Sequence, residues 1–176
     1  MILGCFGDSI TEGYLVPPEA AWPSVLQRIS GITTLNFGVS GDTTSDGIRR
    51  LKAVLSRDMD AVFLEFGLND FFMGIPRQLA RDNLARMATA FLQKDIKVIL
   101  AGFVFSGQGS AGWHEMYLEL AQTLELPLYQ DIFRGLSNCE SCFLPDGLHP
   151  NRRGYEIMAE EICSFLKDTL PLAGLR

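Results

Sequence analysis

The sequence predicts an α/β protein in which a parallel β-sheet lies between two layers of helices. Short apolar or β-branched runs alternate along the chain with longer segments of helical period. Several of the short runs are apolar at nearly every position, which is typical of strands covered on both faces. Alternating strands and helices form βαβ units, and such units place their strands parallel in one sheet.

Five segments have the composition of strands, so we expect about five parallel strands. They are residues 2–6, 33–37, 61–66, 97–103 and 127–129. Three further segments have the clearest helical period, with apolar residues recurring on one face. They are residues 44–55 with Ile48, Leu51 and Leu55 inward, 77–93 with Leu84, Met87, Phe91 and Leu92, and 150–166 with Ile157, Ile162 and Phe165. Three prolines, Pro17, Pro18 and Pro23, place the first helix late.

Length and charge limit what the chain can do. Its 176 residues suffice for one good core, and we expect residues 1–176 to form a single domain. The 15 basic and 21 acidic residues give a net charge of −6, and the basic residues form no run. Nucleic acid is therefore not an expected partner, because a negative surface repels phosphate.

Neither a membrane span nor a secretory leader is expected. The longest apolar runs are far shorter than the ~20 residues that cross a bilayer, so we expect no stable membrane insertion. Residues 1–7 contain no basic region and only a short apolar stretch. As it stands the sequence predicts a cytoplasmic protein, whereas a chain from which a leader had been removed would be periplasmic or secreted. It is compatible with a monomer or a small homo-oligomer.

Four cysteines are too few for a disulfide scaffold. Two of them, Cys139 and Cys142, form a lone C-x-x-C with no second pair. We expect this spacing to be a coincidence in a surface loop. A local disulfide is the first alternative and a zinc site the second.

Polar residues gather where the predicted strands end. In open parallel sheets, ligands bind in the loops that follow the carboxyl ends of the strands. Four segments of this kind are residues 7–11 (GDSIT), 36–43 (NFGVSGDT), 67–70 (GLND) and 146–150 (DGLHP). We expect all four to converge on one rim of the sheet.

These residue types permit nucleophilic acyl transfer. Ser9 would need a base that removes its proton as it attacks. The chain has two histidines, and His149 is preferred because Asp146 precedes it by three residues, within reach in a tight turn to hold the imidazole in the right tautomer. His114 is expected near the start of a helix, in a spacing typical of neither a zinc site nor a triad. The oxyanion formed in the reaction needs donors, which the amide of Gly41, the side chain of Asn69 and the amide of Ser9 can supply.

At this point the pattern resembles the SGNH (GDSL-type) hydrolases, whose four conserved blocks look like Gly7-Asp8-Ser9, Gly41, Asn69 and Asp146-Gly147-Leu148-His149-Pro150. The likeness runs in order from residue 1 to about residue 165. It is closest to the thioesterase I and arylesterase branch, given Ser40-Gly41-Asp42-Thr43 and His149-Pro150-Asn151-Arg152. Relatives often carry two glycines before the asparagine, where this chain has Gly67-Leu68.

The resemblance implies a flavodoxin-like, three-layer α/β/α sandwich. It also implies that Ser9 is the nucleophile, that Asp146 and His149 complete the triad, and that Ser9, Gly41 and Asn69 form the oxyanion hole. Apolar residues after the asparagine, Phe71, Phe72 and Met73, are expected to line a groove for the substrate together with Leu148. The alternative for Phe71 and Phe72 is partial burial in the core.

The expected activity is hydrolysis of carboxylic esters or thioesters (acyl ester, aryl ester, acyl-CoA or lysophospholipid) through an acyl-Ser9 intermediate, with no metal and no cofactor. A carbohydrate O-deacetylase using the same triad is the alternative, followed by a non-catalytic binding domain.

One motif would indicate a different function, the binding of a dinucleotide. Residues 107–112 fit the dinucleotide pattern G-x-G-x-x-G, with Asp131 about 20 residues on. The motif lies too late in the chain for a second mononucleotide half, so a flexible loop beside the substrate cleft is preferred.

Overall fold

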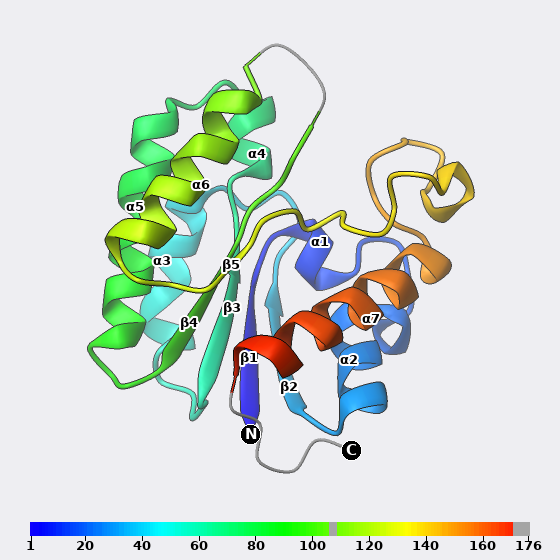
Figure 1. Ribbon diagram of the computed structural model, residues 1–176, viewed down its shortest axis with the longest axis horizontal. Helices are drawn as coiled ribbons and strands as arrows, with labels where there is room; N and C mark the ends of the chain where they lie inside the picture. Colours follow the sequence, from blue (N-terminus) through cyan, green and yellow to red (C-terminus); the bar gives the residue numbers. More distant parts are fainter. Residues whose placement is uncertain (106–108, 171–176) are drawn as a thin grey trace.

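A computed structural model describes residues 1–105 and 109–170 and shows the expected three layers (Figure 1). Five strands form one parallel sheet in the order β2-β1-β3-β4-β5, the flavodoxin-like order. They are β1 (Ile2–Gly7), β2 (Thr33–Gly38), β3 (Ala61–Glu65), β4 (Lys97–Ala101) and β5 (Leu128–Tyr129). The predicted fold class is confirmed, and each strand lies within one or two residues of its predicted bounds.

Helices cover both faces of the sheet (Figure 1). One face carries α3 (Thr44–Val54), α5 (Arg77–Leu92) and α6 (Ala111–Thr123), and the other carries α2 (Trp22–Ser30) and α7 (Arg152–Thr169). Two short helices, α1 (Ser9–Glu12) and α4 (Leu68–Phe72), follow β1 and β3. Two 3₁₀ turns, η1 (Pro18–Ala20) and η2 (Glu140–Cys142), complete the fold. Among the described residues, no helix is both long and apolar enough to cross a membrane.

The last helix begins later than the sequence pattern predicts. It starts at Arg152 and not at Pro150, because Asn151 caps it: the Asn151 side chain accepts hydrogen bonds from the backbone N–H groups of Arg153 (3.0 Å) and Gly154 (3.2 Å). An N-cap residue has non-helical backbone angles, so the helix cannot extend back through it. Pro150 therefore lies outside the helix, in the turn that carries the fourth polar segment.

The register of the sheet aligns the polar segments. Gly7, the last residue of β1, lies opposite Gly38 of β2 on one side and opposite Glu65 of β3 on the other. All three strands thus reach their carboxyl ends at the same level, where their loops begin. The central strands β1 and β3 are buried along almost their whole length, which holds this edge rigidly against both helical layers.

The C-x-x-C segment differs from its expected role. Cys139 and Cys142 are joined by a disulfide, with their Cα atoms 5.3 Å apart. The η2 turn brings the two residues together, since a 3₁₀ turn places residues three apart on one side. The remaining two cysteines, Cys5 and Cys163, are unpaired and buried.

Candidate active site

Three polar side chains form a continuous hydrogen-bonded chain at the carboxyl edge of the sheet. Ser9 Oγ lies 2.9 Å from Nε2 of His149, although the two residues are 140 positions apart. His149 Nδ1 lies 2.8 Å from Oδ2 of Asp146. This is the arrangement in which a serine hydroxyl can pass its proton to an imidazole that a carboxylate orients.

The Asp146 carboxylate is held ionised by its own turn. Its Oδ1 accepts hydrogen bonds from the backbone N–H groups of Leu148 (2.9 Å) and His149 (3.0 Å). These two bonds, joined by the contact with the imidazole, lower the pKa of Asp146 to about 2. A carboxyl group with a lowered pKa is charged at every pH well above that value, so Asp146 remains an acceptor for His149 through the neutral range.

Ser9, the expected nucleophile, is positioned by the turn between β1 and α1. Asp8 caps α1, and its Oδ1 accepts the backbone N–H of Ile10 at 2.9 Å. Ser9 is the first residue of the helix and is 7% exposed. The ring of Tyr14, just after α1, lies 4.4 Å from the ring of His149, centroid to centroid. Tyr14 thus packs against the imidazole, a contact that the sequence pattern did not reveal.

Two of the expected oxyanion donors are backbone amides. Within residues 1–105 and 109–170, the N–H groups of Ser9 and Gly41 donate no hydrogen bond. Gly41 has φ +82°, in the left-handed region that disfavours side chains. A free amide held in a fixed turn can receive a negative oxygen without rearranging first.

Asn69 has a more complex position. Its Nδ2 donates to the backbone oxygen of Asp42 (2.9 Å) and to Oδ2 of Asp8 (3.1 Å). One amide group therefore ties together the loops after β1, β2 and β3. An –NH₂ group has two protons, so donation from Asn69 to an oxyanion requires sharing or releasing one of these bonds.

A half-buried arginine stabilises the second of these loops, the one that follows β2. Arg50 of α3 donates from Nε to Asp42 Oδ2 at 2.7 Å, from one terminal nitrogen to the oxygen of Phe37 at 3.0 Å, and from the other to the oxygen of Gly7 at 3.3 Å. Its guanidinium also lies 5.0 Å from the centroid of the Phe6 ring. Because these contacts join β1, β2 and residue 42, Arg50 fixes the loop that presents the Gly41 amide.

The buried carboxyl group of Glu65 lies beneath the Ser9 turn. Glu65, at the end of β3, is 3% exposed, and its Oε2 accepts a hydrogen bond from Thr11 Oγ1 at 2.8 Å. Burial raises the pKa of Glu65 well above its usual range, and the charge of Asp8 raises it further. Burial also raises the pKa of Asp8, while the hydrogen bond from the backbone N–H of Ile10 lowers it. The backbone N–H of Asp8 donates to Oε2 of Glu65 at 3.4 Å, so Glu65 holds the residue that caps α1.

Gly7 has no room for a side chain at this point. A Cβ there would lie 2.5 Å from Oε2 and 2.6 Å from the backbone oxygen of Glu65. We expect Gly7→Ala to lower the free energy of unfolding by about 1–3 kcal/mol, because overpacking against backbone forces the strands apart. Urea denaturation measures this loss.

Gly4→Ala is the matched control for that variant. Gly4 lies on the same strand, but its Cβ would meet Sδ of Met59, the flexible tip of a side chain, at 2.6 Å. We expect a smaller loss for Gly4→Ala. Equal denaturation midpoints for Gly7→Ala and the unchanged chain would contradict the packing argument.

Two of the residues expected to line an apolar groove, Phe71 and Phe72, belong to an aromatic cluster. The Phe71 ring lies 5.3 Å from Phe72, 5.7 Å from Phe103, 6.3 Å from Phe105 and 6.0 Å from Trp113, centroid to centroid. Phe71 is half-buried in the cluster, whereas Phe72 is 56% exposed and Met73 is 61% exposed. Phe72 and Met73 are therefore available to a ligand, and the Phe71 ring packs against Phe72. Leu148 lines a pocket beside the His149 turn, and Phe105 of the aromatic cluster lines the same pocket.

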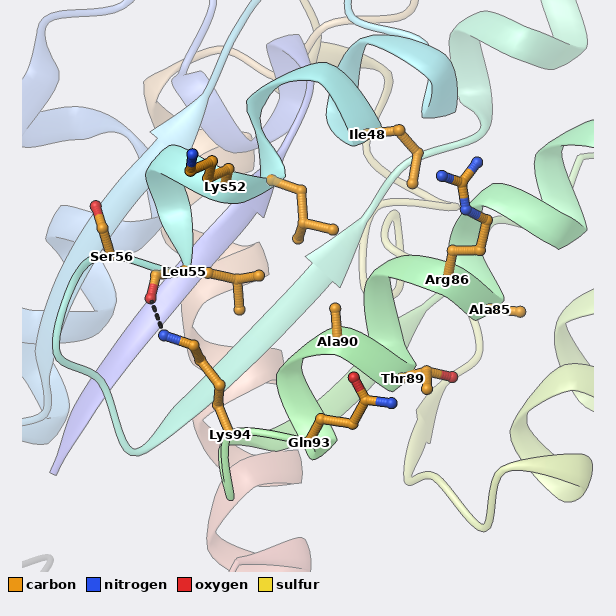
Figure 2. A pocket seen from close by; sticks show the side chains of 11 residues that line it. Ile48, Lys52, Leu55, Ser56, Ala85, Arg86, Thr89, Ala90, Gln93 and Lys94 are labelled. Carbon is orange, nitrogen blue, oxygen red and sulfur yellow. Dashed lines mark hydrogen bonds between the residues drawn. The ribbon is translucent and has the colours of Figure 1, made fainter.

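A larger hollow lies away from the triad, between α3 and α5 (Figure 2). Its volume is about 760 Å³. Its lining includes Ile48, Leu51 and Leu55 on the α3 side and Ala85 and Ala90 of α5. Lys94 closes one end by donating from Nζ to the backbone oxygen of Leu55 at 3.0 Å. None of the predicted site residues lines this hollow, so it is no part of the candidate active site.

The structure bears only partly on the G-x-G-x-x-G motif. Gly107 and Gln108 of that motif lie outside the described residues, together with Ser106 of the expected loop. Gly112 lies within α6. Nowhere in the part of the chain that the structure describes do three or more His, Cys, Asp or Glu side chains group in a way that could hold a metal ion.

Glu65, Asp131 and Arg50 were missed as members of this region. Glu65 is the charged residue within an otherwise apolar strand, and a carboxyl in a strand buried on both faces signals a special role. Asp131 follows β5 just as the other polar segments follow their strands. Arg50 carries no such signal, because a basic residue in an amphipathic helix is ordinarily solvent-exposed.

A five-stranded parallel sheet with a Ser–His–Asp chain at its carboxyl edge defines an α/β serine hydrolase. Comparison with known proteins identifies the family of hydrolases. Residues 5–157 match the GDSL-like lipase/acylhydrolase family, and the chain belongs to this family. It is an ester-cleaving enzyme, as the family resemblance of its motifs implied.

Individual relatives agree with this assignment. The chain is 28% identical to an arylesterase of Vibrio mimicus, over 91% of this chain and 85% of the relative. It is 27% identical to thioesterase 1/protease 1/lysophospholipase L1 of Escherichia coli (strain K12), over 92% of this chain and 81% of the relative. The crystal structure of TesA superposes with a TM-score of 0.90 at 25% identity, covering 97% of this chain and all (100%) of that one.

Proposed function

We propose that residues 1–176 act as one domain that hydrolyses small to medium carboxylic esters and thioesters through an acyl-Ser9 intermediate. The observation that carries the proposal is the pair of contacts from Ser9 Oγ to His149 Nε2 (2.9 Å) and from His149 Nδ1 to Asp146 Oδ2 (2.8 Å). The names of relatives, which include an arylesterase and a thioesterase, support the same bond types.

In the first half of the reaction, His149 Nε2 takes the proton of Ser9 as Oγ attacks the ester carbonyl. Asp146 stabilises the imidazolium that results. The carbonyl oxygen becomes an oxyanion, which the free amides of Ser9 and Gly41 and the side chain of Asn69 are placed to receive. Loss of one such donor typically lowers turnover by ~10²–10³-fold.

In the second half, the tetrahedral intermediate collapses and the alcohol or thiol leaves with the proton from His149. Water then attacks the acyl-Ser9 carbonyl while His149 accepts its proton. Collapse of the second intermediate frees the carboxylic acid and returns the proton to Ser9 Oγ. Each proton moves through the same nitrogen, so no metal or redox cofactor enters these steps.

Covalent labelling tests this function directly. An organofluorophosphonate reacts with an activated serine hydroxyl, and mass spectrometry of the digested protein identifies the modified residue. We expect a single adduct on Ser9 and none on Ser9→Ala. A protein that stays unlabelled while folded would indicate the non-catalytic binding domain.

The acyl group is proposed to lie against the exposed part of the aromatic cluster. Phe72→Ala is expected to lower kcat/KM for p-nitrophenyl octanoate by about three- to tenfold and to change the butyrate little, because a short acyl chain does not reach the ring. Leu92→Ala is the matched control, since Leu92 is likewise exposed but ends α5 at the far edge of the sheet. An equal loss on both esters would count against this placement.

Faster turnover of an acetylated sugar than of either ester would favour the O-deacetylase.

A further inference from the structure

A small pocket adjoins the turn that carries the triad's acid and base. Its volume is about 260 Å³, and Gly147 and Leu148, which lie between Asp146 and His149, form part of its wall. Phe105, Phe133, Phe143 and Asp131 also line it. The pocket therefore combines aromatic rings with one acidic side chain. Its wall includes Leu148, the residue directly before His149 in the sequence.

The aromatic rings form a continuous wall. The centroids of Phe105 and Phe133 are 5.6 Å apart, and those of Phe133 and Phe143 are 6.3 Å apart. The face of an aromatic ring carries partial negative charge, which attracts a cation placed over it. Aromatic walls of this kind recognise quaternary ammonium groups in many proteins.

The two oxygens of the Asp131 carboxylate in this pocket differ in their hydrogen bonds. Asp131 Oδ1 accepts hydrogen bonds from the backbone N–H groups of Phe133 (3.1 Å) and Val104 (3.3 Å). Across residues 1–105 and 109–170, Oδ2 of Asp131 accepts no hydrogen bond, and its carboxylate forms no ion pair with a Lys or Arg side chain. Burial raises the pKa of Asp131, and the nearby His114 of α6 partly opposes this effect. A cation bound in the pocket would supply the counter-charge that the carboxylate lacks.

The reaction geometry decides which part of a substrate would reach this pocket. His149 must give its proton to the leaving oxygen, so the alcohol part of the ester lies on the side of the imidazole. The pocket is built on the same turn as His149. Phe105 of this pocket packs against Phe72, so the pocket adjoins the proposed acyl site. A group on the imidazole side of Phe105 would be carried by the alcohol.

We propose that this pocket binds an organic ammonium group on the alcohol part of the ester, which makes the enzyme selective for esters of amino alcohols such as choline. The proposal rests on the proposed function for the orientation of the ester. The net charge of −6 favours it, because an acidic protein attracts cationic substrates over a distance.

Two esters of equal shape provide the test. Butyrylcholine and 3,3-dimethylbutyl butyrate differ in one atom, since a carbon replaces the charged nitrogen. We expect kcat/KM to favour butyrylcholine by about tenfold. Asp131→Asn should bring the ratio close to one, because an asparagine oxygen can still accept from Phe133 and Val104 while the charge is lost.

Asp58→Asn is the matched control, because it removes the same charge from an exposed residue before β3, at the opposite edge of the sheet. Its ester ratio should equal that of the unchanged enzyme. Equal kcat/KM for the two esters, or a preference that survives Asp131→Asn, would overturn the proposal. A preference lost equally in Asp58→Asn would also overturn it, since general attraction by the net charge would then explain the effect.

A binding measurement separates this proposal from the proposed function. In an NMR titration of Ser9→Ala, choline should bind about tenfold more tightly than 3,3-dimethylbutan-1-ol, and Asp131→Asn should abolish the difference. This comparison needs no turnover. Failure to hydrolyse p-nitrophenyl butyrate would contradict the proposed function alone, whereas equal binding of the two alcohols would contradict the pocket alone.

Discussion

Ser9→Ala is expected to lower kcat for p-nitrophenyl butyrate by roughly 10⁴-fold or more, because it removes the atom that forms the acyl-enzyme. Ser9 is the first residue of α1, and the cap on that helix comes from Asp8, so the fold does not depend on the hydroxyl. We therefore expect an unchanged urea midpoint beside the lost activity. Steady-state kinetics and denaturation of the same preparation check both expectations.

Ser40→Ala serves as the control for this variant. Ser40 lies in the loop after β2, and its hydroxyl donates to the carboxylate of Glu12. Its removal should change kcat by less than about tenfold, since Ser40 does not contact the imidazole of His149. Full activity in Ser9→Ala would refute the acyl-Ser9 mechanism.

His149→Ala is expected to lower kcat by roughly 10³–10⁴-fold or more at neutral pH, because no group then takes the Ser9 proton or returns it to the leaving oxygen. The lowered pKa of Asp146 (about 2) adds a constraint on the pH profile. A carboxyl whose pKa is depressed is ionised above that value, so protonation of Asp146 should not limit activity above about pH 4. Rates of the unchanged enzyme and of His149→Ala between pH 4 and pH 9 measure the loss of kcat and the effect of Asp146 protonation.

The second histidine of the chain offers the matched control. His114 lies on α6, where it interacts electrostatically with Asp131. His114→Ala should retain most of the activity towards a neutral ester. If His149→Ala stayed active while His114→Ala did not, the assignment of the base would be reversed.

Most of the fold was predictable because its signals are local. Apolar runs such as residues 61–66 indicate strands buried on both faces, and the spacing of Leu84, Met87 and Phe91 indicates a helix with one inward face. The start of α7 was misplaced by two residues, because Pro150 and Asn151 both suit a helix entry and only the observed cap distinguishes them. The disulfide between Cys139 and Cys142 was not the preferred prediction, since a C-x-x-C spacing alone does not reveal whether the turn brings the two sulfur atoms together.

The triad could be predicted because one rule brings its parts together. Parallel strands all end at the same edge, so polar residues after different strands meet there. The same rule could not show how Asn69 divides its two protons between Asp42 and Asp8. That depends on positions adjusted to fractions of an ångström by contacts such as those of Arg50.

The order of residues along the chain was thus enough to determine the layers, the direction of the strands and the meeting of Ser9, Asp146 and His149, because each follows from short-range periodicity combined with the geometry of parallel sheets. Only the tertiary structure decided that Glu65 lies buried against Asp8 beneath the Ser9 turn, and that Asp131 lies with three phenylalanine rings beside the His149 turn. Both arrangements bring together residues from different strands and loops. Their burial and charge therefore arise from packing, which no local pattern in the sequence records.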